Sequence, residues 1–161
     1  MEIRPLRESD IGACLEIYQY YIENTTYTFE EERLDEALFA ARVRRITERF
    51  PFLVAVEEGK IVGYAYLDRF HERSAYRYTA DLSIYLDHRV LHRGVGSLLY
   101  AAIESAAREA GFCQLLSLVT AENAGSVAFH EKHGFVLRGE LPDVGYKFNR
   151  WLGVRYYQKT L

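Results

Sequence analysis

Apolar residues in the first fifty positions follow the period of an α-helix in two places. Ser9 and Asp10 are typical N-terminal helix caps, and the segment after them has apolar residues three or four positions apart. This apolar face consists of Ile11, Leu15, Tyr18 and Ile22. A second helix is predicted for residues 34–49, with four arginines exposed to solvent and with Leu38, Ala41 and Ile46 turned inward. A short extended segment at residues 3–6 precedes both helices.

From residue 52 the period changes to two, which indicates β-strands. Residues 52–56 and 61–66 are predicted to form a hairpin around a tight turn at residues 58–60. Further strands are predicted at 79–86 and 115–120, and the second of these is a continuous apolar run typical of a central strand. Helices are predicted at 94–110 and 124–133, each followed by a glycine that can end it. Extended segments begin at residue 135 and close the chain at 155–161.

The predicted element order is β-α-α-β-β-β-α-β-α-β-β, which is typical of an α/β protein of the α+β type. The chain has 161 residues and no repeat, linker or low-complexity segment, so one domain spanning residues 1–161 is expected. Hydrophobic residues make up 49% of the sequence, which argues against disorder.

Charge and cysteine content exclude several classes of function. The formal net charge of −3 gives no general attraction to nucleic acid or to acidic membranes. No apolar run is long enough to span a bilayer, and the polar N-terminus does not look like a signal peptide. Cys14 and Cys113 form no metal or redox motif, which favours a reducing, cytoplasmic location. His88 and His92 stand four residues apart without a third ligand, so no metal site is expected.

Two glycines, Gly94 and Gly96, stand between a predicted strand and a predicted helix. A helix N-terminus presents unpaired N–H groups and a partial positive charge, and glycine allows an anion close approach. Arg93 and Ser97 add a cation and a hydroxyl donor, so the segment from His92 to Ser97 is interpreted as a phosphate cradle. A tight strand-to-helix turn remains the alternative. The spacing does not match the dinucleotide fingerprint or the P-loop of NTPases.

The segments LSIYL (residues 82–86) and ENAGSVAFHEKHGF (residues 122–135), together with the element order, resemble the GNAT N-acetyltransferases. IENTTYTF, SAYRYTADLSIYL and GYKFNRW are similar to the phosphinothricin and methionine sulfoximine acetyltransferases within that family. The resemblance covers nearly the whole chain. It implies a mixed central sheet in which two parallel strands splay apart, acetyl-CoA as acetyl donor, a small amino-acid-like amine as acceptor, and a homodimer.

The resemblance also implies which residues bind the donor. The pantetheine would pair with the backbone of the strand before the cradle, the pyrophosphate would lie on the cradle, and an asparagine would contact the pantetheine arm. These residues are Ile84, Tyr85, Leu86, His92, Arg93, Gly94, Val95, Gly96, Ser97 and Asn123. The family prefers Gln or Arg where this chain has Leu91. Backbone amides do most of the phosphate binding, so the cradle is expected to function without that side chain.

Two side chains are candidate proton carriers. Asp81 stands where the subgroup keeps a glutamate, and it would accept the proton of the amine directly or through a water molecule. The alternative for Asp81 is an ion pair with a neighbouring arginine. His130 stands where many relatives have a tyrosine near the thioester sulfur. It would protonate the thiolate, bind the cofactor by a hydrogen bond, or serve the fold alone.

The acceptor pocket is expected to combine aromatic walls with a cation that binds a carboxylate or phosphinate. Arg73 is the first candidate for that cation and Lys147 the second, and each has a surface role as the alternative. The aromatic candidates are Phe29, Phe70, Tyr76 and Tyr78. The segment 145–151 would lie near this pocket or near the dimer interface.

Three other functions remain open on the sequence. The acceptor could be another amine, such as a polyamine or a protein N-terminus, although residues 30–32 form the only acidic run. The chain could also be a non-catalytic acyl-CoA sensor, or an interaction domain that dimerises through its aromatic surface. The presence of both Asp81 and His130 favours an enzyme over a sensor, and an intact cradle argues against the interaction domain.

Overall fold

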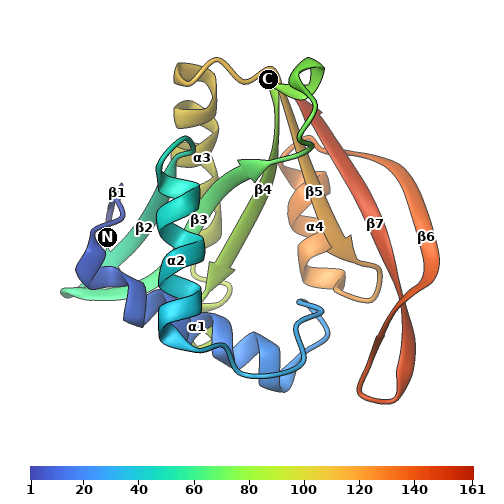
Figure 1. The fold of residues 1–161 in the computed structure, drawn as a ribbon, viewed down its shortest axis with the longest axis horizontal. Helices are drawn as coiled ribbons and strands as arrows, with labels where there is room; N and C mark the ends of the chain where they lie inside the picture. Colours follow the sequence, from blue (N-terminus) through green and yellow to red (C-terminus); the bar gives the residue numbers. More distant parts are fainter.

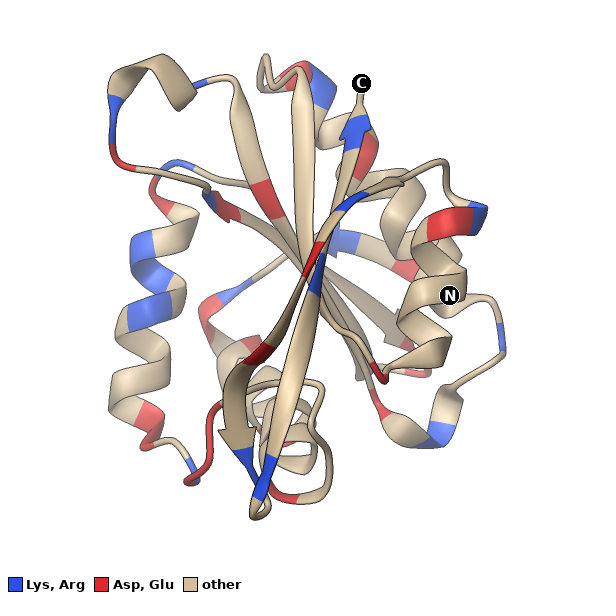
Figure 2. Cartoon of the chain, turned by 90° about the vertical axis from the view of Figure 1, so that its right-hand side faces the viewer, with Lys and Arg blue, Asp and Glu red and all other residues tan.

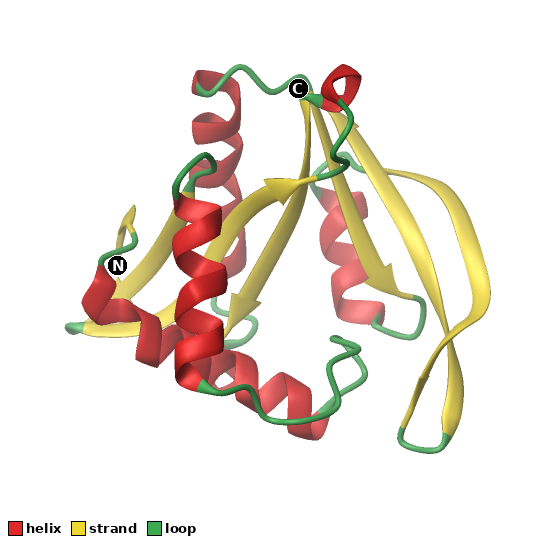
Figure 3. Ribbon diagram, in the orientation of Figure 1, coloured by secondary structure: helices red, strands yellow, loops and turns green.

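The elements follow the predicted order around one sheet of seven strands in this computed structural model, which describes residues 1–161 (Figures 1 and 3). The strands are β1 (Glu2–Pro5), β2 (Phe52–Glu57), β3 (Lys60–Arg69), β4 (Thr79–Leu86), β5 (Gln114–Thr120), β6 (Val136–Lys147) and β7 (Arg150–Thr160). The helices are α1 (Ile11–Asn24), α2 (Glu36–Thr47), α3 (Val95–Glu109) and α4 (Ala124–Lys132). Short 3-10 turns lie at Glu8–Asp10, Ser74–Tyr76 and His88–Val90.

The sheet is mixed, in the order β1-β2-β3-β4-β5-β7-β6. Its one parallel contact joins β4 to β5 and spans only three residue pairs, from Thr79–Gln114 to Asp81–Leu116. Beyond Asp81, β4 continues to pair with β3 and β5 continues to pair with β7. The expected splay is therefore present, and it opens a gap between the second halves of β4 and β5 (Figure 1).

Helices cover both faces of the sheet and enclose two apolar cores. One core packs α3 against strands β2–β5 and reaches α4 through Val127 and Phe129. The other core packs α1 and α2 against the aromatic side of β2 and β3, including Phe52 and Tyr64. In Figure 1, α1 and α2 lie on the near face and α3 and α4 on the far face. The gap between β4 and β5 thus opens between two helical layers.

The predicted inner face of α2 is wrong at two of its three positions. Asp35 caps the helix by accepting hydrogen bonds from the N–H groups of the first turn. With the helix so oriented, Leu38 and Ala41 are exposed and only Ile46 faces the sheet as predicted. The buried residues are Phe39, Ala40, Val43 and Ile46. Both sets fit a helical period, so the periodicity in this segment could not select between them.

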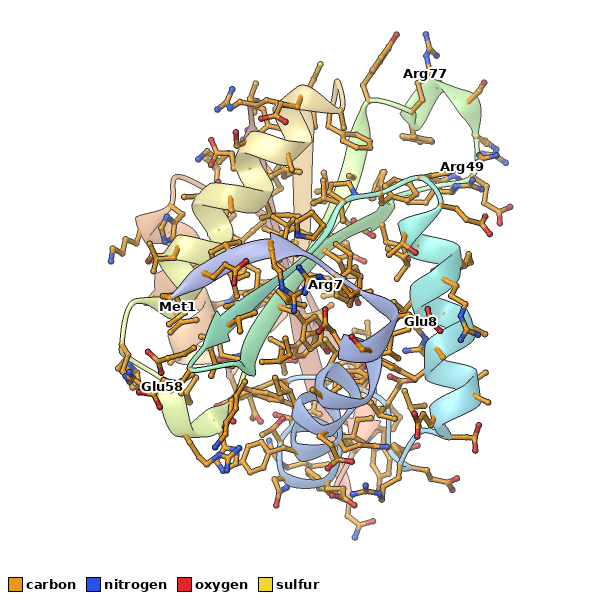
Figure 4. The ribbon with its side chains drawn as sticks, turned by 90° about the vertical axis from the view of Figure 1, so that its left-hand side faces the viewer. Met1, Arg7, Glu8, Arg49, Glu58 and Arg77 are labelled. Atoms are coloured by element: carbon orange, nitrogen blue, oxygen red, sulfur yellow. The ribbon has the colours of Figure 1, made fainter.

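The arginines of α2 are also less free than predicted. Three of the four arginines of the predicted helix lie on α2, spaced along one side of it in Figure 2, and all three form ion pairs with other segments. The pairs are Arg42 with Glu30, Arg44 with Glu8 and Arg45 with Asp68. Figure 4 shows Glu8 beside this helix, and Arg49 at the end of the molecule where α2 stops. Ion pairs therefore tie α2 to three neighbouring segments.

Two strands are several residues longer than the sequence pattern predicted. β3 continues through Asp68 and Arg69, and β7 begins at Arg150 instead of residue 155. A two-residue turn joins β6 to β7, with φ of 52° at Phe148 and 59° at Asn149, as hairpins of this kind require. β6 is exposed along most of its length. A strand without a buried face has no apolar alternation, so its extent could not be predicted from periodicity.

Candidate active site

The gap between β4 and β5 exposes backbone groups of β4 that no strand pairs. The Leu82 carbonyl, where the gap begins, accepts a hydrogen bond of 3.4 Å from Ser117 on β5. The Leu86 carbonyl, at its end, accepts one of 2.7 Å from the Tyr21 hydroxyl. Alternate residues of a strand direct their backbone groups to the same side, so Ile84 also faces the gap. This is the edge on which the resemblance places the pantetheine.

The start of α3 has the backbone geometry that the predicted phosphate cradle requires. Gly94 caps the helix with a left-handed φ of 83°, and His92 is also left-handed at 63°. The first helical hydrogen bond runs from Leu98 N–H to the Gly94 carbonyl. The N–H groups of Val95, Gly96 and Ser97 consequently have no partner within the helix. Several unpaired N–H groups at a helix start suit a phosphate oxygen.

The second glycine of the cradle has a different role from the first. Gly94 is needed for its backbone conformation, and a side chain there would meet open space. A Cβ on Gly96 would lie 3.3 Å from the Phe129 ring and 3.4 Å from a methyl group of Leu86. The absence of that Cβ lets α3 pack closely against α4 and the end of β4.

The cradle side chains are engaged within the protein. Arg93 forms an ion pair of 2.9 Å with Glu57 and stays about half exposed. The Ser97 hydroxyl lies 3.1 Å from His133 Nε2. Asn123 caps α4, its Oδ1 accepting from Ser126 N–H at 3.1 Å. The backbone amides, rather than these side chains, are left free for a ligand.

Asp81 is half-buried at the last residue pair before β4 and β5 separate. It makes no ion pair, so the alternative of an arginine partner is not met. Burial, with a smaller contribution from the neighbouring Asp68 carboxylate, raises the pKa of Asp81 to about 6. A carboxylate with that pKa is ionised at neutral pH and holds a proton more strongly than an ordinary aspartate.

His130 is buried, and its hydrogen bonds restrict its chemistry. Its Nδ1 lies 2.7 Å from the Ser126 carbonyl. A carbonyl only accepts, so Nδ1 carries the hydrogen and Nε2 is the free acceptor of a neutral ring. Burial lowers the pKa of His130, and the ring stacks on Tyr157 at 5.6 Å between centroids. The geometry therefore disfavours the proton-donor role and favours a structural or cofactor-contacting one.

The six acceptor candidates do not meet in one pocket. Four of them lie on the β3–β4 connection: Phe70, Arg73, Tyr76 and Tyr78. The other two, Phe29 and Lys147, lie near the opposite end of β4, on the α1–α2 connection and at the end of β6. Figure 1 shows the two connections at the top and the bottom of the molecule. Within one chain, the six candidates therefore form two separate groups.

Lys147, the second candidate for binding an acceptor anion, is a buried residue with 2% exposure. Its Nζ donates to the Thr28 carbonyl at 2.9 Å. Burial lowers the pKa of Lys147, and the nearby Glu31 and Glu30 oppose that shift. Arg73 is exposed and makes no ion pair. Of the two cations, Arg73 is therefore the one free to meet a ligand.

Sequence reasoning missed a cluster that fixes the α1–α2 connection. Glu122, beside the cofactor candidate Asn123, binds Arg150 at 2.5 and 2.6 Å and accepts from the Thr26 hydroxyl. The Thr120 hydroxyl donates to the Thr26 carbonyl at 2.8 Å. These partners stand 28 to 96 residues apart in the chain. No local pattern could have indicated them.

No group of three or more His, Cys, Asp or Glu side chains is arranged to hold a metal ion. His88 stacks on Tyr20 at 3.8 Å between ring centroids. None of the helices has the length and apolar character needed to cross a membrane.

Residues 3–153 match the family model of the acetyltransferase (GNAT) domain. The phosphinothricin N-acetyltransferase of Streptomyces viridochromogenes is 33% identical over 159 residues, which cover 99% of this chain and 87% of that protein.

Two solved structures share the whole fold. The ribosomal-protein-alanine N-acetyltransferase of Brucella melitensis superposes with a TM-score of 0.97 at 35% identity, and each chain is covered completely. A phosphinothricin acetyltransferase of Sinorhizobium meliloti, solved in complex with acetyl-CoA, has a TM-score of 0.96 at 33% identity. That match covers 99% of this chain and 88% of the other.

Proposed function

The chain belongs to the GNAT acetyltransferase family, and we propose that it transfers acetyl from acetyl-CoA to the amine of a small amino-acid-like substrate. The acceptor class is that of phosphinothricin or methionine sulfoximine. The observation that carries the proposal is an unpaired, half-buried carboxylate, Asp81, at the point where β4 and β5 separate. The similarity to phosphinothricin acetyltransferases over 99% of the chain supports the acceptor class.

The structure fits the donor at both ends of the gap. The unpaired N–H groups of Val95, Gly96 and Ser97 suit a pyrophosphate, and a Cβ on Gly96 would crowd Phe129 and Leu86. The free edge of β4 at Ile84 suits the amide groups of a pantetheine chain. Acetyl-CoA supplies the activated acetyl thioester. The Leu86 N–H, on the gap side of β4, is the donor proposed to polarise the thioester carbonyl.

Asp81 is proposed to prepare the acceptor. An amine is mostly protonated at neutral pH and cannot attack a carbonyl in that form. The Asp81 carboxylate takes one proton from the ammonium group, directly or through water, and leaves a neutral amine. The new C–N bond then forms as the C–S bond breaks, and the thiolate leaves with the electron pair. The attacking nitrogen gives up its second proton and the thiolate takes one up, directly or through water, so the products are the neutral amide and the free thiol, and Asp81 returns its proton to solvent. Because the pKa of Asp81 is raised to about 6, activity should rise with pH through that value.

The decisive experiment is thiol release from acetyl-CoA with a panel of amines. The panel comprises phosphinothricin, methionine sulfoximine, common amino acids, spermidine and a peptide with an N-terminal alanine. Turnover with the first two supports the proposal. Turnover only with the peptide would favour an acceptor like that in the name of the Brucella melitensis protein. Donor binding without turnover on any amine would favour a sensor.

Two variants separate donor binding from proton transfer. Gly94→Glu places a side chain at a left-handed position and a negative charge at the helix start, so acetyl-CoA binding should be lost. Open space surrounds Gly94, so strain and charge, rather than a clash, cause the effect. Asp81→Asn should lower kcat/KM about a hundredfold with donor binding retained. An Asp81→Asn enzyme with full activity at neutral pH would remove Asp81 from this role.

A homodimer is part of the proposal. Large apolar side chains are exposed on β5, β6, β7 and the turn between β6 and β7, and some of them lie in the segment 145–151, which the resemblance places near the acceptor pocket or the dimer interface. They are Leu118, Val136, Leu137, Leu141, Val144, Tyr146, Phe148 and Trp151, with Trp151 the most exposed at 64%. Sedimentation equilibrium of the wild type and of Trp151→Glu tests the assignment. Two monomeric proteins would refute it.

The proposed location is the cytoplasm. Cys14 is buried and Cys113 is exposed, and both are free thiols. An exposed thiol persists in a reducing compartment.

A further inference from the structure

Asp81 has a second carboxylate directly opposite it on the neighbouring strand. The antiparallel register of β3 and β4 pairs Asp68 with Asp81. Directly opposite residues point to the same face of the sheet, with Cα atoms roughly 4.5–5.5 Å apart. Like charges in such a pair repel, and a fold normally avoids them unless something compensates.

Only one of the two carboxylates is compensated. Arg45 on α2 donates to both oxygens of Asp68, at 3.0 and 2.7 Å. The backbone N–H of Arg69 donates to the same carboxylate at 2.7 Å. No arginine or lysine pairs with Asp81. The two aspartates therefore share a face of the sheet but have opposite electrostatic surroundings.

We propose that the Asp68–Arg45 pair tunes Asp81, with Asp68 increasing the proton affinity of that carboxylate and Arg45 limiting the increase. This inference rests on the proposed function in that Asp81 is taken as the proton acceptor. Asp68 and Arg45 are positioning residues in this scheme, since neither is placed against the substrate. Removing either one should shift the pH dependence of the enzyme, and the two shifts should have opposite directions.

The geometry sets the sign of each effect. Asp68 is the nearest charged neighbour of Asp81, whereas Arg45 reaches Asp68 from α2 and is 56% exposed. Asp81 therefore experiences the carboxylate of the pair more strongly than the guanidinium. Burial acts first and Asp68 second in raising the pKa of Asp81. Burial of Asp68 opposes its ionisation, but hydrogen bonds from Arg45 and Arg69 lower its pKa overall, so it stays charged.

No other charge adjoins Asp81 from the elements around it. Beside it on β3 and β4, the neighbours on the same face are Tyr66 and Ser83, which are uncharged at neutral pH. Across the parallel contact on β5 lies Leu116, and opposite Leu116 on β7 lies Gln158. The next charged side chain of α2, Arg42, donates from both terminal nitrogens of its guanidinium group to the Glu30 carboxylate. The Asp68–Arg45 pair is thus the local control on Asp81.

A higher proton affinity is useful for this chemistry. A carboxylate with an ordinary pKa near 4 is a weak base toward an ammonium group. Proton transfer becomes more favourable as the pKa of the acceptor approaches the working pH, provided that the group stays ionised there. Asp68 increases the driving force, and Arg45 keeps Asp81 ionised at neutral pH.

The test compares the acid limb of the kcat/KM profile among four variants. In Asp68→Asn the apparent pKa of that limb should fall by about half a unit to one unit, since a nearby anion is lost from a partly solvated site. In Arg45→Gln it should rise by a similar or smaller amount. The double variant should lie between Asp68→Asn and the wild type, because Asp81 experiences the carboxylate of the pair more strongly than the guanidinium. Arg44→Gln is the matched control, because Arg44 is next on the same helix and pairs with Glu8.

A carbon-13 NMR titration of the Asp81 carboxyl separates this inference from the proposed function. The Asp81→Asn variant assigns the resonance. Opposite shifts of that titration in Asp68→Asn and Arg45→Gln, with Arg44→Gln unchanged, support the tuning pair. If the carboxyl titration moves but the kcat/KM profile does not, the tuning stands and the role of Asp81 as the base fails. If the carboxyl titration is the same in all variants, the tuning is refuted.

Discussion

The α1–α2 connection, residues 25–35, is bonded to several distant strands, whereas the β3–β4 connection, residues 70–78, is bonded mainly to itself. In the first, Thr26 is hydrogen-bonded to the last residue of β5 and to Glu122 shortly after it. Thr28 is hydrogen-bonded to Lys147 on β6 and to Tyr18 on α1. In the second, the hydrogen bonds join neighbours such as Arg77 and Ser74, until the Tyr78 carbonyl accepts from β5 at its end. In Figure 4, Arg77 points away from the rest of the molecule.

The difference indicates how each connection can contribute to binding. A segment already held in place loses little conformational entropy when a ligand binds, whereas a segment held locally must be ordered at a cost in affinity. We expect the α1–α2 connection to present a preformed surface. The β3–β4 connection, with the exposed Arg73, is expected to become ordered on the acceptor or on a second copy of the chain.

The largest loss of stability is expected from adding a side chain to Gly145, which packs against the Phe29 ring. A Cβ on Gly145 would lie 2.2 Å from the Phe29 ring, so Gly145→Val must displace that ring. Overpacking of this kind costs about 1–3 kcal/mol, and the upper end applies here. Gly139→Val on the same strand meets no atom within 4 Å and is the matched control. Equal melting temperatures for the two variants would contradict the preformed contact.

Loss of the buried lysine should rank second. Lys147→Met keeps the length of the side chain but leaves the Thr28 carbonyl without its donor. The expected loss in the free energy of unfolding is about 2 kcal/mol, measured by urea denaturation. Lys60→Met, at an exposed position on β3, should change stability by less than about 0.5 kcal/mol. If Lys147→Met has the same free energy of unfolding as the wild type, the Lys147 amine does not stabilise the α1–α2 connection.

The Glu122–Arg150 pair should contribute less, and in a defined pH range. The hydrogen bond from Arg150, then that from Thr26, lowers the pKa of Glu122 to about 2. A depressed folded-state pKa stabilises the protein above the unfolded value near 4.5, and the contribution disappears as pH falls toward 2. Both side chains are more than a third exposed, so solvent screening limits the effect to less than about 1 kcal/mol.

The measurement is the stability difference between the wild type and Glu122→Gln at pH 7 and at pH 2.5. The difference should be present at pH 7 and should diminish at pH 2.5. Glu23→Gln, in the exposed pair with Arg33, is the control. A difference that grows toward low pH would have the wrong sign for this ion pair.

The smallest effect on stability is expected in the β3–β4 connection. Arg73→Ala removes an exposed side chain without an ion pair, so stability should change by less than about 0.5 kcal/mol. If Arg73 binds the acceptor anion, KM for the acceptor should rise about tenfold or more while KM for acetyl-CoA stays constant. A large stability loss, or equal effects on the two KM values, would contradict the contrast between the two connections.

Much of the fold could be predicted because its signals are local. The helical period of α1, the glycines that end α3 and α4, and the apolar run of β5 each lie within a few residues. The predicted cap of α1 is wrong in its contact, because the Asp10 carboxylate accepts from Arg4 and from the Arg7 N–H and makes no cap hydrogen bond to α1. The same holds for the cradle, because a helix N-terminus and a left-handed Gly94 are properties of a short segment. The prediction of the buried face of α2 was wrong because Leu38 and Phe39 both fit a helical period.

The candidate site was predicted less completely, since its residues acquire their properties from remote partners. Asp81 could be identified as a candidate from the sequence and its resemblance to the family. That Asp81 has no ion-pair partner follows from the fold, in which Arg45 pairs with Asp68 on the neighbouring strand. Lys147 was expected to be free for an acceptor, yet Thr28, 119 residues earlier in the chain, holds it. His130 was a proton-donor candidate until the Ser126 carbonyl fixed its tautomer.

By itself, the sequence determined the order of strands and helices, the position of the cradle and the family that the chain resembles. Each of these depends on backbone preferences and on the pattern of apolar residues within short windows. Only the tertiary structure decided which carboxylate remains unpaired, which cations are free and where the α1–α2 and β3–β4 connections lie. Charge and hydrogen bonding act through space over a few ångströms, and folding brings together at that distance residues that lie far apart in the chain.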